Sequence, residues 1–116
     1  LYFLARTDGY DVPDDEAERA KFMGRIPAVL ELTHNWGTET QQDFAYHDGN
    51  AEPQGFGHIC FNVPDLEAAQ AWFDEHDVTF VKRADQGKMK DVIFVKDPDG
   101  YWIEVIQADR MAAMGD

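Results

Sequence analysis

The stretch GHICFNVPDLEAAQAWFDE, residues 57–75, decides the fold. Its first seven residues alternate like a strand and stop at Pro64. Asp65 then offers a side chain that favours the start of a helix. The stretch therefore predicts a strand followed by a helix that ends near Glu75. One stripe of this helix is apolar and is expected to face the core; it consists of Leu66, Ala69, Trp72 and Phe73.

Strand patterns continue on both sides of this stretch. After it, residues 79–82, 91–96 and 101–106 are typical of strands, and Asp97–Gly100 has turn chemistry. The order from residue 57 onward is therefore strand, helix, strand, strand, strand. Before it come a strand at 1–5, a short helix at 16–23 and a strand at 28–34, which resemble the second half of the same unit. The sequence thus indicates a weak internal repeat.

The chain opens with the apolar run LYFLA, residues 1–5. A strand this apolar is normally covered by neighbours on both sides. We therefore expect it to lie inside a sheet, and the chain to be the later part of a longer polypeptide. An edge strand at a native amino terminus is the alternative interpretation.

Composition excludes several classes of protein. The 116 residues include 23 acidic and 10 basic side chains, a net charge of −13 that argues against binding a nucleic-acid backbone. No apolar run approaches the roughly 18 residues of a membrane span. The single cysteine excludes an intrachain disulfide and a cysteine-only metal site. These features predict an acidic cytoplasmic domain, and its aromatic residues indicate a real core.

Three titratable residues stand within apolar strands, where an isolated charge is costly. They are Glu31, His58 and Glu104. Two carboxylates and one imidazole on the concave face of a curled sheet would suit a divalent metal such as Zn²⁺ or Ni²⁺. The alternative is that each glutamate faces water and the histidine is an ordinary polar residue.

Three segments carry a resemblance to a known family. They are LELTHNWGTE at 30–39, GFGHI at 55–59 and DPDGYWIE at 97–104. In order and spacing they closely resemble the glyoxalase I (lactoylglutathione lyase) family of the vicinal oxygen chelate superfamily, over residues 1 to about 114. The long insertion at 36–54 is similar to that of the zinc-using class of this family rather than the nickel-preferring class.

The resemblance implies an α+β fold of paired βαβββ modules with curled mixed sheets. Residues 1–55 would hold the latter half of the first module and a long connecting loop, and residues 56–116 the second module and a C-terminal tail. It further implies a homodimer with its active site at the subunit interface. The implied reaction converts the hemithioacetal of methylglyoxal and glutathione, the cosubstrate, to S-lactoylglutathione.

Position by position, the resemblance also implies roles for individual residues. Glu31, His58 and Glu104 match three of the family's four metal ligands, for Zn²⁺ or alternatively Ni²⁺ or another divalent metal. Glu104 matches the principal base, and Glu31 the carboxylate that handles the opposite proton position. Residues matching positions that hold glutathione are Asn35, Lys82 and Lys88, and those near the substrate pocket are Met89, Trp102 and Met111.

The sequence also departs from the family pattern. In the family, the fourth ligand lies on the opening strand of the first module and a glutathione-binding arginine also lies upstream, and this sequence contains neither. Gln54 stands where the family has a second binding arginine, which removes a charge-assisted hydrogen bond of about 1.5–3 kcal/mol. A second hypothesis is therefore a metal-free or partly liganded binding module for a small thiol conjugate. An extradiol dioxygenase fits less well, because Glu31 occupies the place of a histidine.

Overall fold

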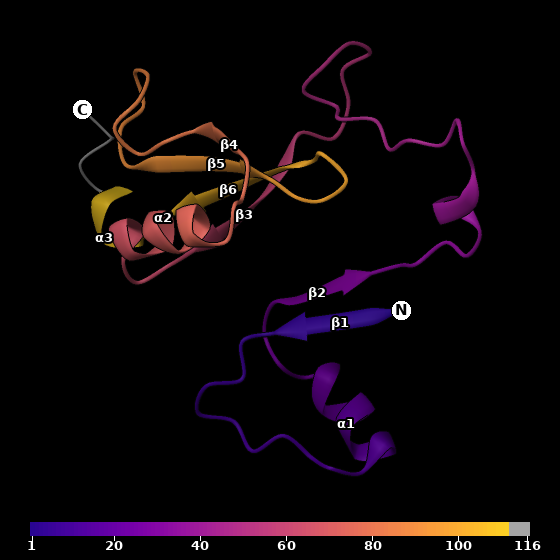
Figure 1. The fold of residues 1–116 in the computed structure, drawn as a ribbon. Helices are drawn as coiled ribbons and strands as arrows, with labels where there is room; N and C mark the ends of the chain where they lie inside the picture. The colour runs from indigo at the N-terminus through magenta and orange to yellow at the C-terminus, as the bar shows by residue number, and fades with distance from the viewer. Residues whose placement is uncertain (112–116) are drawn as a thin grey trace. The chain divides into compact units, whose positions relative to one another are not determined.

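The structure is a computed structural model that describes residues 1–111. Its chain forms two compact units, one from Leu1 to Phe44 and the other beginning at Ala45 (Figure 1). Residues 112–116, the end of the predicted C-terminal tail, lie outside the described residues. The predicted module boundary at residues 55 and 56 stays a prediction. No helix among the described residues is long and apolar enough to cross a membrane.

The second unit has the predicted order of elements. They are β3 (His58–Asn62), α2 (Leu66–Glu75), β4 (Phe80–Lys82), β5 (Val92–Lys96) and β6 (Trp102–Ile106), followed by a short helix, α3 (Ala108–Met111). Its sheet has the strand order β3-β6-β5-β4, in which β3 is parallel to β6 and the other pairs are antiparallel. The sheet is therefore mixed, as predicted, and the first and last strands of the unit are neighbours.

Helix α2 covers one face of this sheet (Figure 1). The Asp65 side chain accepts a hydrogen bond of 2.8 Å from the Ala68 N–H and so caps the helix, as predicted. Leu66 is fully buried at the centre of the core. The other buried members of this cluster are Ile93, Val95 and Val105, and Ala69 and Phe73 pack against it.

The prediction that Trp72 belongs to the buried stripe is wrong. Its side chain is 53% exposed, and its ring stacks on His76 with centroids 3.8 Å apart. Successive helical residues are rotated by about 100°, so the sixth residue after Leu66 points about 120° away from it. Leu66, Ala69 and Phe73 share a narrower face that Trp72 does not join.

This difference gives a matched pair of stability predictions. Replacing Leu66 with Ala is expected to lower the free energy of unfolding by about 2–5 kcal/mol, because it leaves a cavity in the core. Replacing Trp72 with Ala removes a larger side chain from the same helix but is expected to cost about 1 kcal/mol, mainly through its ring contacts. Urea unfolding of both variants checks this, and equal costs would contradict the assigned core.

The turn before β6 fixes where that strand begins. Asp97 accepts hydrogen bonds of 2.9 Å from the N–H groups of Asp99 and Tyr101, and Gly100 takes a left-handed conformation with φ 92°. Glycine suits that conformation because it lacks a Cβ atom. The predicted turn is confirmed, and it returns the chain so that Trp102 and Glu104 lie beside β5.

The first unit contains a two-stranded antiparallel sheet of β1 (Tyr2–Ala5) and β2 (Val29–Leu32), with α1 (Glu16–Met23) between them in sequence. Asp15 caps α1 by accepting the Glu18 N–H at 2.9 Å. Among the described residues β1 pairs only with β2, and all four of its residues are exposed. Coverage of this strand by a second neighbour stays a prediction.

Strand β2 is shorter than predicted. It ends at Leu32, and a short 3₁₀ helix, η1 (Thr38–Thr40), follows within the predicted loop. The strand ends where its pairing ends, because Leu32 pairs with Tyr2 at the start of β1. Beyond it the His34 ring packs against Trp36, with centroids 4.4 Å apart, and its Nε2 lies 3.3 Å from the Glu39 carboxylate.

Candidate active site

Two of the predicted metal ligands meet in the second unit. The Nε2 atom of His58 lies 3.0 Å from Oε2 of Glu104, although the two residues are 46 positions apart in sequence. Parallel pairing of β3 with β6 allows this diagonal contact, because Glu104 lies opposite Cys60 and His58 stands two residues earlier on the same face of β3. Their side chains are 37% and 18% exposed, respectively. The pair is thus accessible at the histidine and more enclosed at the carboxylate.

Strand alternation places the pair on the sheet face opposite α2. Ile103 and Val105 of β6 belong to the core against α2, so the residues between and beside them point the other way. In register, His58 lies opposite Trp102 and Cys60 lies opposite Glu104. The face that carries the candidate site therefore combines an imidazole, a carboxylate, a thiol and an indole.

Aromatic side chains surround the pair. Phe94 of β5 lies opposite Glu104 in register, and its ring meets the His58 ring edge-on, with centroids 5.1 Å apart and an angle of 83° between the planes. The Trp102 ring is 5.6 Å from Phe94. The Nε1 of Trp102 is buried without a hydrogen-bond partner. An apolar setting of this kind strengthens electrostatic interactions at the carboxylate.

Cys60 of β3 lies directly opposite Glu104 in register. Partial burial raises the pKa of its thiol, and the nearby charge of Glu104 raises it further. The sequence did not single out Cys60 or Phe94 as site residues. Only the register of β3, β6 and β5 places them beside the pair.

Lys82, a predicted glutathione contact, is half-buried. Its Nζ donates to the carbonyl oxygens of Val92 at 2.6 Å and Arg83 at 3.2 Å. Burial lowers the pKa of its ammonium group, and the nearby Lys90 charge lowers it further. An ammonium has three donors, so one remains for another acceptor. Through these two hydrogen bonds Lys82 stabilises the loop between β4 and β5.

Three other predicted contacts lie in or near this loop and α3. Lys88 and Met89 are exposed in the loop. Met111 is half-buried in α3. The neighbouring Arg110 donates a hydrogen bond of 2.6 Å to the Glu67 side chain and so connects α3 to α2. All of these residues belong to the second unit, and their contacts with a substrate stay predictions.

Glu31 and Asn35 belong to the first unit. Glu31 is exposed on β2, opposite Phe3 of β1. The Asn35 carbonyl accepts hydrogen bonds from the Thr38 N–H at 3.2 Å and the Thr38 hydroxyl at 2.8 Å, and so starts the turn into η1. Their predicted parts in metal and glutathione binding therefore rest on the sequence resemblance.

The donor atoms of His58 and Glu104 fit two neighbouring positions on a divalent metal. Ligand bonds of about 2.0–2.2 Å that enclose an angle of about 90–110° place two donor atoms about 2.8–3.6 Å apart. The observed separation of 3.0 Å falls within this range. Within residues 1–111 no cluster of three or more His, Cys, Asp or Glu side chains is placed to hold an ion. The pair therefore fits as part of a coordination shell.

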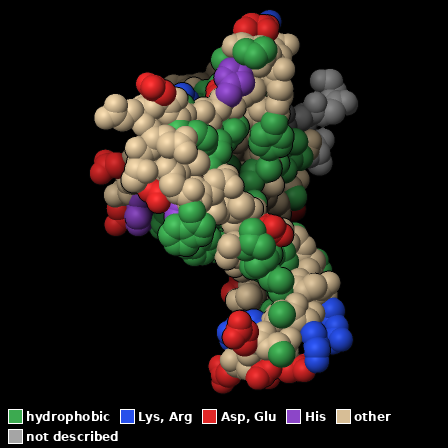
Figure 2. Space-filling view, turned by 90° about the vertical axis from the view of Figure 1, so that its right-hand side faces the viewer, with side chains coloured by type: hydrophobic (Ala, Val, Ile, Leu, Met, Phe, Trp, Pro, Cys, Tyr) green, Lys and Arg blue, Asp and Glu red, His purple; other side chains and the backbone are tan. Residues whose placement is uncertain are grey.

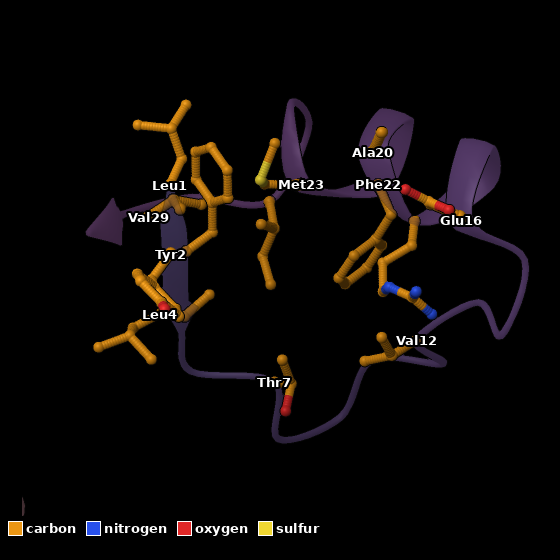
Figure 3. A pocket seen from close by; sticks show the side chains of 14 residues that line it. Leu1, Tyr2, Leu4, Thr7, Val12, Glu16, Ala20, Phe22, Met23 and Val29 are labelled. Carbon is orange, nitrogen blue, oxygen red and sulfur yellow. The ribbon is translucent and has the colours of Figure 1, made fainter. Parts of the chain in front are cut away.

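The cavity of 580 Å³ in the first unit is a different feature (Figure 3). It lies between β1 and α1, and mainly apolar side chains line it, among them Tyr2, Leu4 and Phe22. It includes none of the predicted site residues. Several hydrophobic side chains of this unit are exposed, including Leu1 at 69%, and Figure 2 shows such side chains at the surface.

Comparisons with known proteins match the chain to glyoxalase-type proteins. Residues 3–105 match the model of the Glyoxalase/Bleomycin resistance protein/Dioxygenase superfamily. The chain is 56% identical over 107 residues to a lactoylglutathione lyase of Pseudomonas putida, covering 92% of this chain and 62% of the relative. It is 55% identical over 115 residues to the lactoylglutathione lyase of Pseudomonas aeruginosa, covering 99% and 64%. The chain thus spans less than two-thirds of these relatives.

A solved structure agrees with the sequence relatives. It comes from work on the specificity of the trypanothione-dependent glyoxalase I of Leishmania major in comparison with the human enzyme. It aligns with a TM-score of 0.54 and 33% identity over 74% of this chain and 53% of that chain. This likeness supports the predicted α+β fold of curled sheets. The chain therefore belongs to the Glyoxalase/Bleomycin resistance protein/Dioxygenase superfamily.

Proposed function

We propose that this protein isomerises the hemithioacetal of methylglyoxal and glutathione to S-lactoylglutathione. The observation that carries the proposal is the 3.0 Å contact between His58 and Glu104 on one sheet face. These are two of the residues that the family motifs mark as ligands and base. The Pseudomonas relatives named lactoylglutathione lyase support the same reaction.

His58 and Glu104 would hold a divalent metal, with Glu31 as a further carboxylate ligand from the sequence resemblance. Zn²⁺ is the proposed ion, because imidazole and carboxylate donors suit it and the insertion at 36–54 is similar to that of the zinc-using class. Ni²⁺ or another divalent ion is the alternative. A bound cation would stabilise negative charge that develops on the two substrate oxygens.

Glu104 is the proposed base. Isomerisation moves a proton between adjacent carbons, so one carboxylate can take the proton from one carbon and return it to the other. The Glu104 side chain is only 18% exposed and lies beside Phe94, which limits the access of water to the proton in transit. Glu31 is the proposed carboxylate for the opposite proton position.

The remaining predicted residues would bind the substrate. Glutathione carries two carboxylates, and cationic side chains on an acidic chain would attract them. Lys88 is exposed and Lys82 keeps one donor, so both can contribute, together with Asn35. The proposed pocket for the aldehyde side consists of Met89, Trp102 and Met111. The sequence resemblance adds a homodimer with the active site at the subunit interface to the proposal, and the composition adds a cytoplasmic location.

Metal removal and return test this function. The purified full-length protein is assayed for hemithioacetal isomerisation before chelation, after chelation and after return of Zn²⁺. We expect activity to disappear with the chelator and to return with zinc. No activity in folded, zinc-supplied protein would contradict the proposal. Tight binding of a glutathione conjugate without turnover would instead favour the metal-free or partly liganded binding module.

A further inference from the structure

Arg110 of α3 connects three segments of the second unit. Its guanidinium donates two hydrogen bonds of 2.6 Å to the Glu67 carboxylate in the first turn of α2, one to each oxygen, and α3 lies beside this turn (Figure 1). The same group donates a third hydrogen bond, of 3.0 Å, to Asp91, the residue directly before β5. A planar guanidinium suits such a paired contact with a carboxylate. Arg110 therefore connects both α3 and the start of β5 to α2.

Asp91 closes the loop between β4 and β5. Its N–H donates a hydrogen bond of 3.0 Å to the Ala84 carbonyl at the other end of the loop. The start of the loop is held to α2 separately, because the Ala84 N–H donates to the Gln70 side chain at 3.1 Å. Lys88 and Met89 lie between these two ends and are exposed. The position of these two residues therefore depends on how both ends of the loop are held.

The beginning of α3 has further contacts that do not involve Arg110. The Ala108 N–H donates a hydrogen bond of 2.8 Å to Asn62 at the end of β3, and the Gln107 side chain accepts one of 3.1 Å from the Leu66 N–H. The side chain of Arg110 is 33% exposed, and its two carboxylate partners are more exposed. Ion pairs this close to water contribute little to global stability. Loss of Arg110 is therefore expected to release the loop end while the fold remains.

We propose that Arg110 is a positioning residue for substrate binding that acts through Asp91. It fixes the end of the loop that carries Lys88 and Met89, two of the predicted substrate contacts. Met111, a third, directly follows Arg110 on α3, so the same side chain also holds this residue near α2. The part of these three residues in binding rests on the proposed function, whereas the contacts of Arg110 with the two carboxylates are independent of it.

Amide hydrogen exchange of the full-length protein tests whether Arg110 holds the loop. The probe is the Asp91 amide, whose hydrogen bond to Ala84 closes the loop. In Arg110→Ala this amide is expected to exchange faster than in wild type, because local opening becomes easier. Arg6→Ala is the matched control: it also removes one arginine and one exposed ion pair, with Asp8 at 2.8 Å in the first unit, and should leave the exchange unchanged. Equal exchange in R110A and wild type would overturn the proposal.

Steady-state kinetics test the consequence for binding. We expect R110A to raise KM for the hemithioacetal by about three- to tenfold and to leave kcat within about twofold, because apparent affinity falls with the fraction of molecules whose loop is in place. Asp91→Asn should raise KM in the same way while Arg110 keeps its contact with α2. This variant adds no backbone strain, because Asp91 has φ 59° and asparagine readily adopts this left-handed region.

The double variant D91N/R110A distinguishes a shared role from two separate ones. If Arg110 acts through Asp91, KM of the double variant should equal that of R110A and should not reflect the product of the two single effects. Independent effects, or a wild-type KM in R110A, would overturn the proposal. If the wild-type protein has no isomerase activity, the proposed function fails, and hydrogen exchange alone decides whether Arg110 positions the loop.

Discussion

Replacing Glu104 with Gln is expected to lower the isomerisation rate constant kcat by about 10²–10⁴-fold, the range for loss of a general acid–base group. Gln keeps the length of the side chain and can still accept a hydrogen bond from His58 through its amide oxygen. It cannot take up the proton that isomerisation moves. Because the side chain lies on the face opposite the α2 core, the fold should remain intact.

The measurement compares kcat, KM and the melting curve of this variant with those of Glu75→Gln. Glu75 is exposed at the end of α2, so this control makes the same change of charge without touching the site. We expect full activity in the control and similar melting temperatures in both variants. If E104Q retains most of the wild-type activity, Glu104 is not the base, and a loss accompanied by unfolding would be a stability effect.

The second unit could be predicted well because its signals are local. Pro64 and Asp65 mark the change from strand to helix, and Asp97 to Gly100 mark the turn before the last strand. Each of these signals acts within a few residues of where it stands. Trp72 departs from the predicted stripe because burial on a helix depends on the angle of the side chain around the axis as well as on its apolar character.

The first unit was less predictable for the opposite reason. Whether the strand at residues 2–5 is covered depends on partners that are distant in sequence, and its own apolar pattern cannot name them. Strand β2 ends at Leu32, which pairs with Tyr2 at the start of β1, so its length follows from the partner strand and not from its own pattern.

In the candidate site, too, local sequence signals could be predicted and contacts between distant residues could not. Glu104 and His58 could be singled out as polar residues in apolar strands, but their contact follows from parallel pairing of strands far apart in sequence. The half-buried position of Lys82 depends on the path of the loop that brings the Val92 carbonyl to its ammonium. Cys60 could not be distinguished from an ordinary strand residue until the register placed it opposite Glu104.

Replacing His58 with Ala is expected to weaken Zn²⁺ binding by at least about 100-fold. Loss of a group that only orients a ligand costs about 10–100-fold in affinity, and loss of the ligand itself should cost no less. The site would keep Glu104 but lose the imidazole nitrogen 3.0 Å from it. Competition with a chromogenic chelator measures the affinity, and metal analysis after dialysis gives the occupancy.

His76→Ala is the matched control for that experiment. It also removes one imidazole, but His76 stacks on Trp72 at the end of α2, and its Nδ1 lies 2.8 Å from the Trp72 carbonyl oxygen. We expect wild-type zinc affinity in H76A, because this ring contacts the helix and has no part in the proposed ligand set. Equal zinc content in H58A and wild type would remove His58 from that set. Since His58 is partly exposed on the face away from the core, a loss of zinc without a loss of fold would identify it as a ligand.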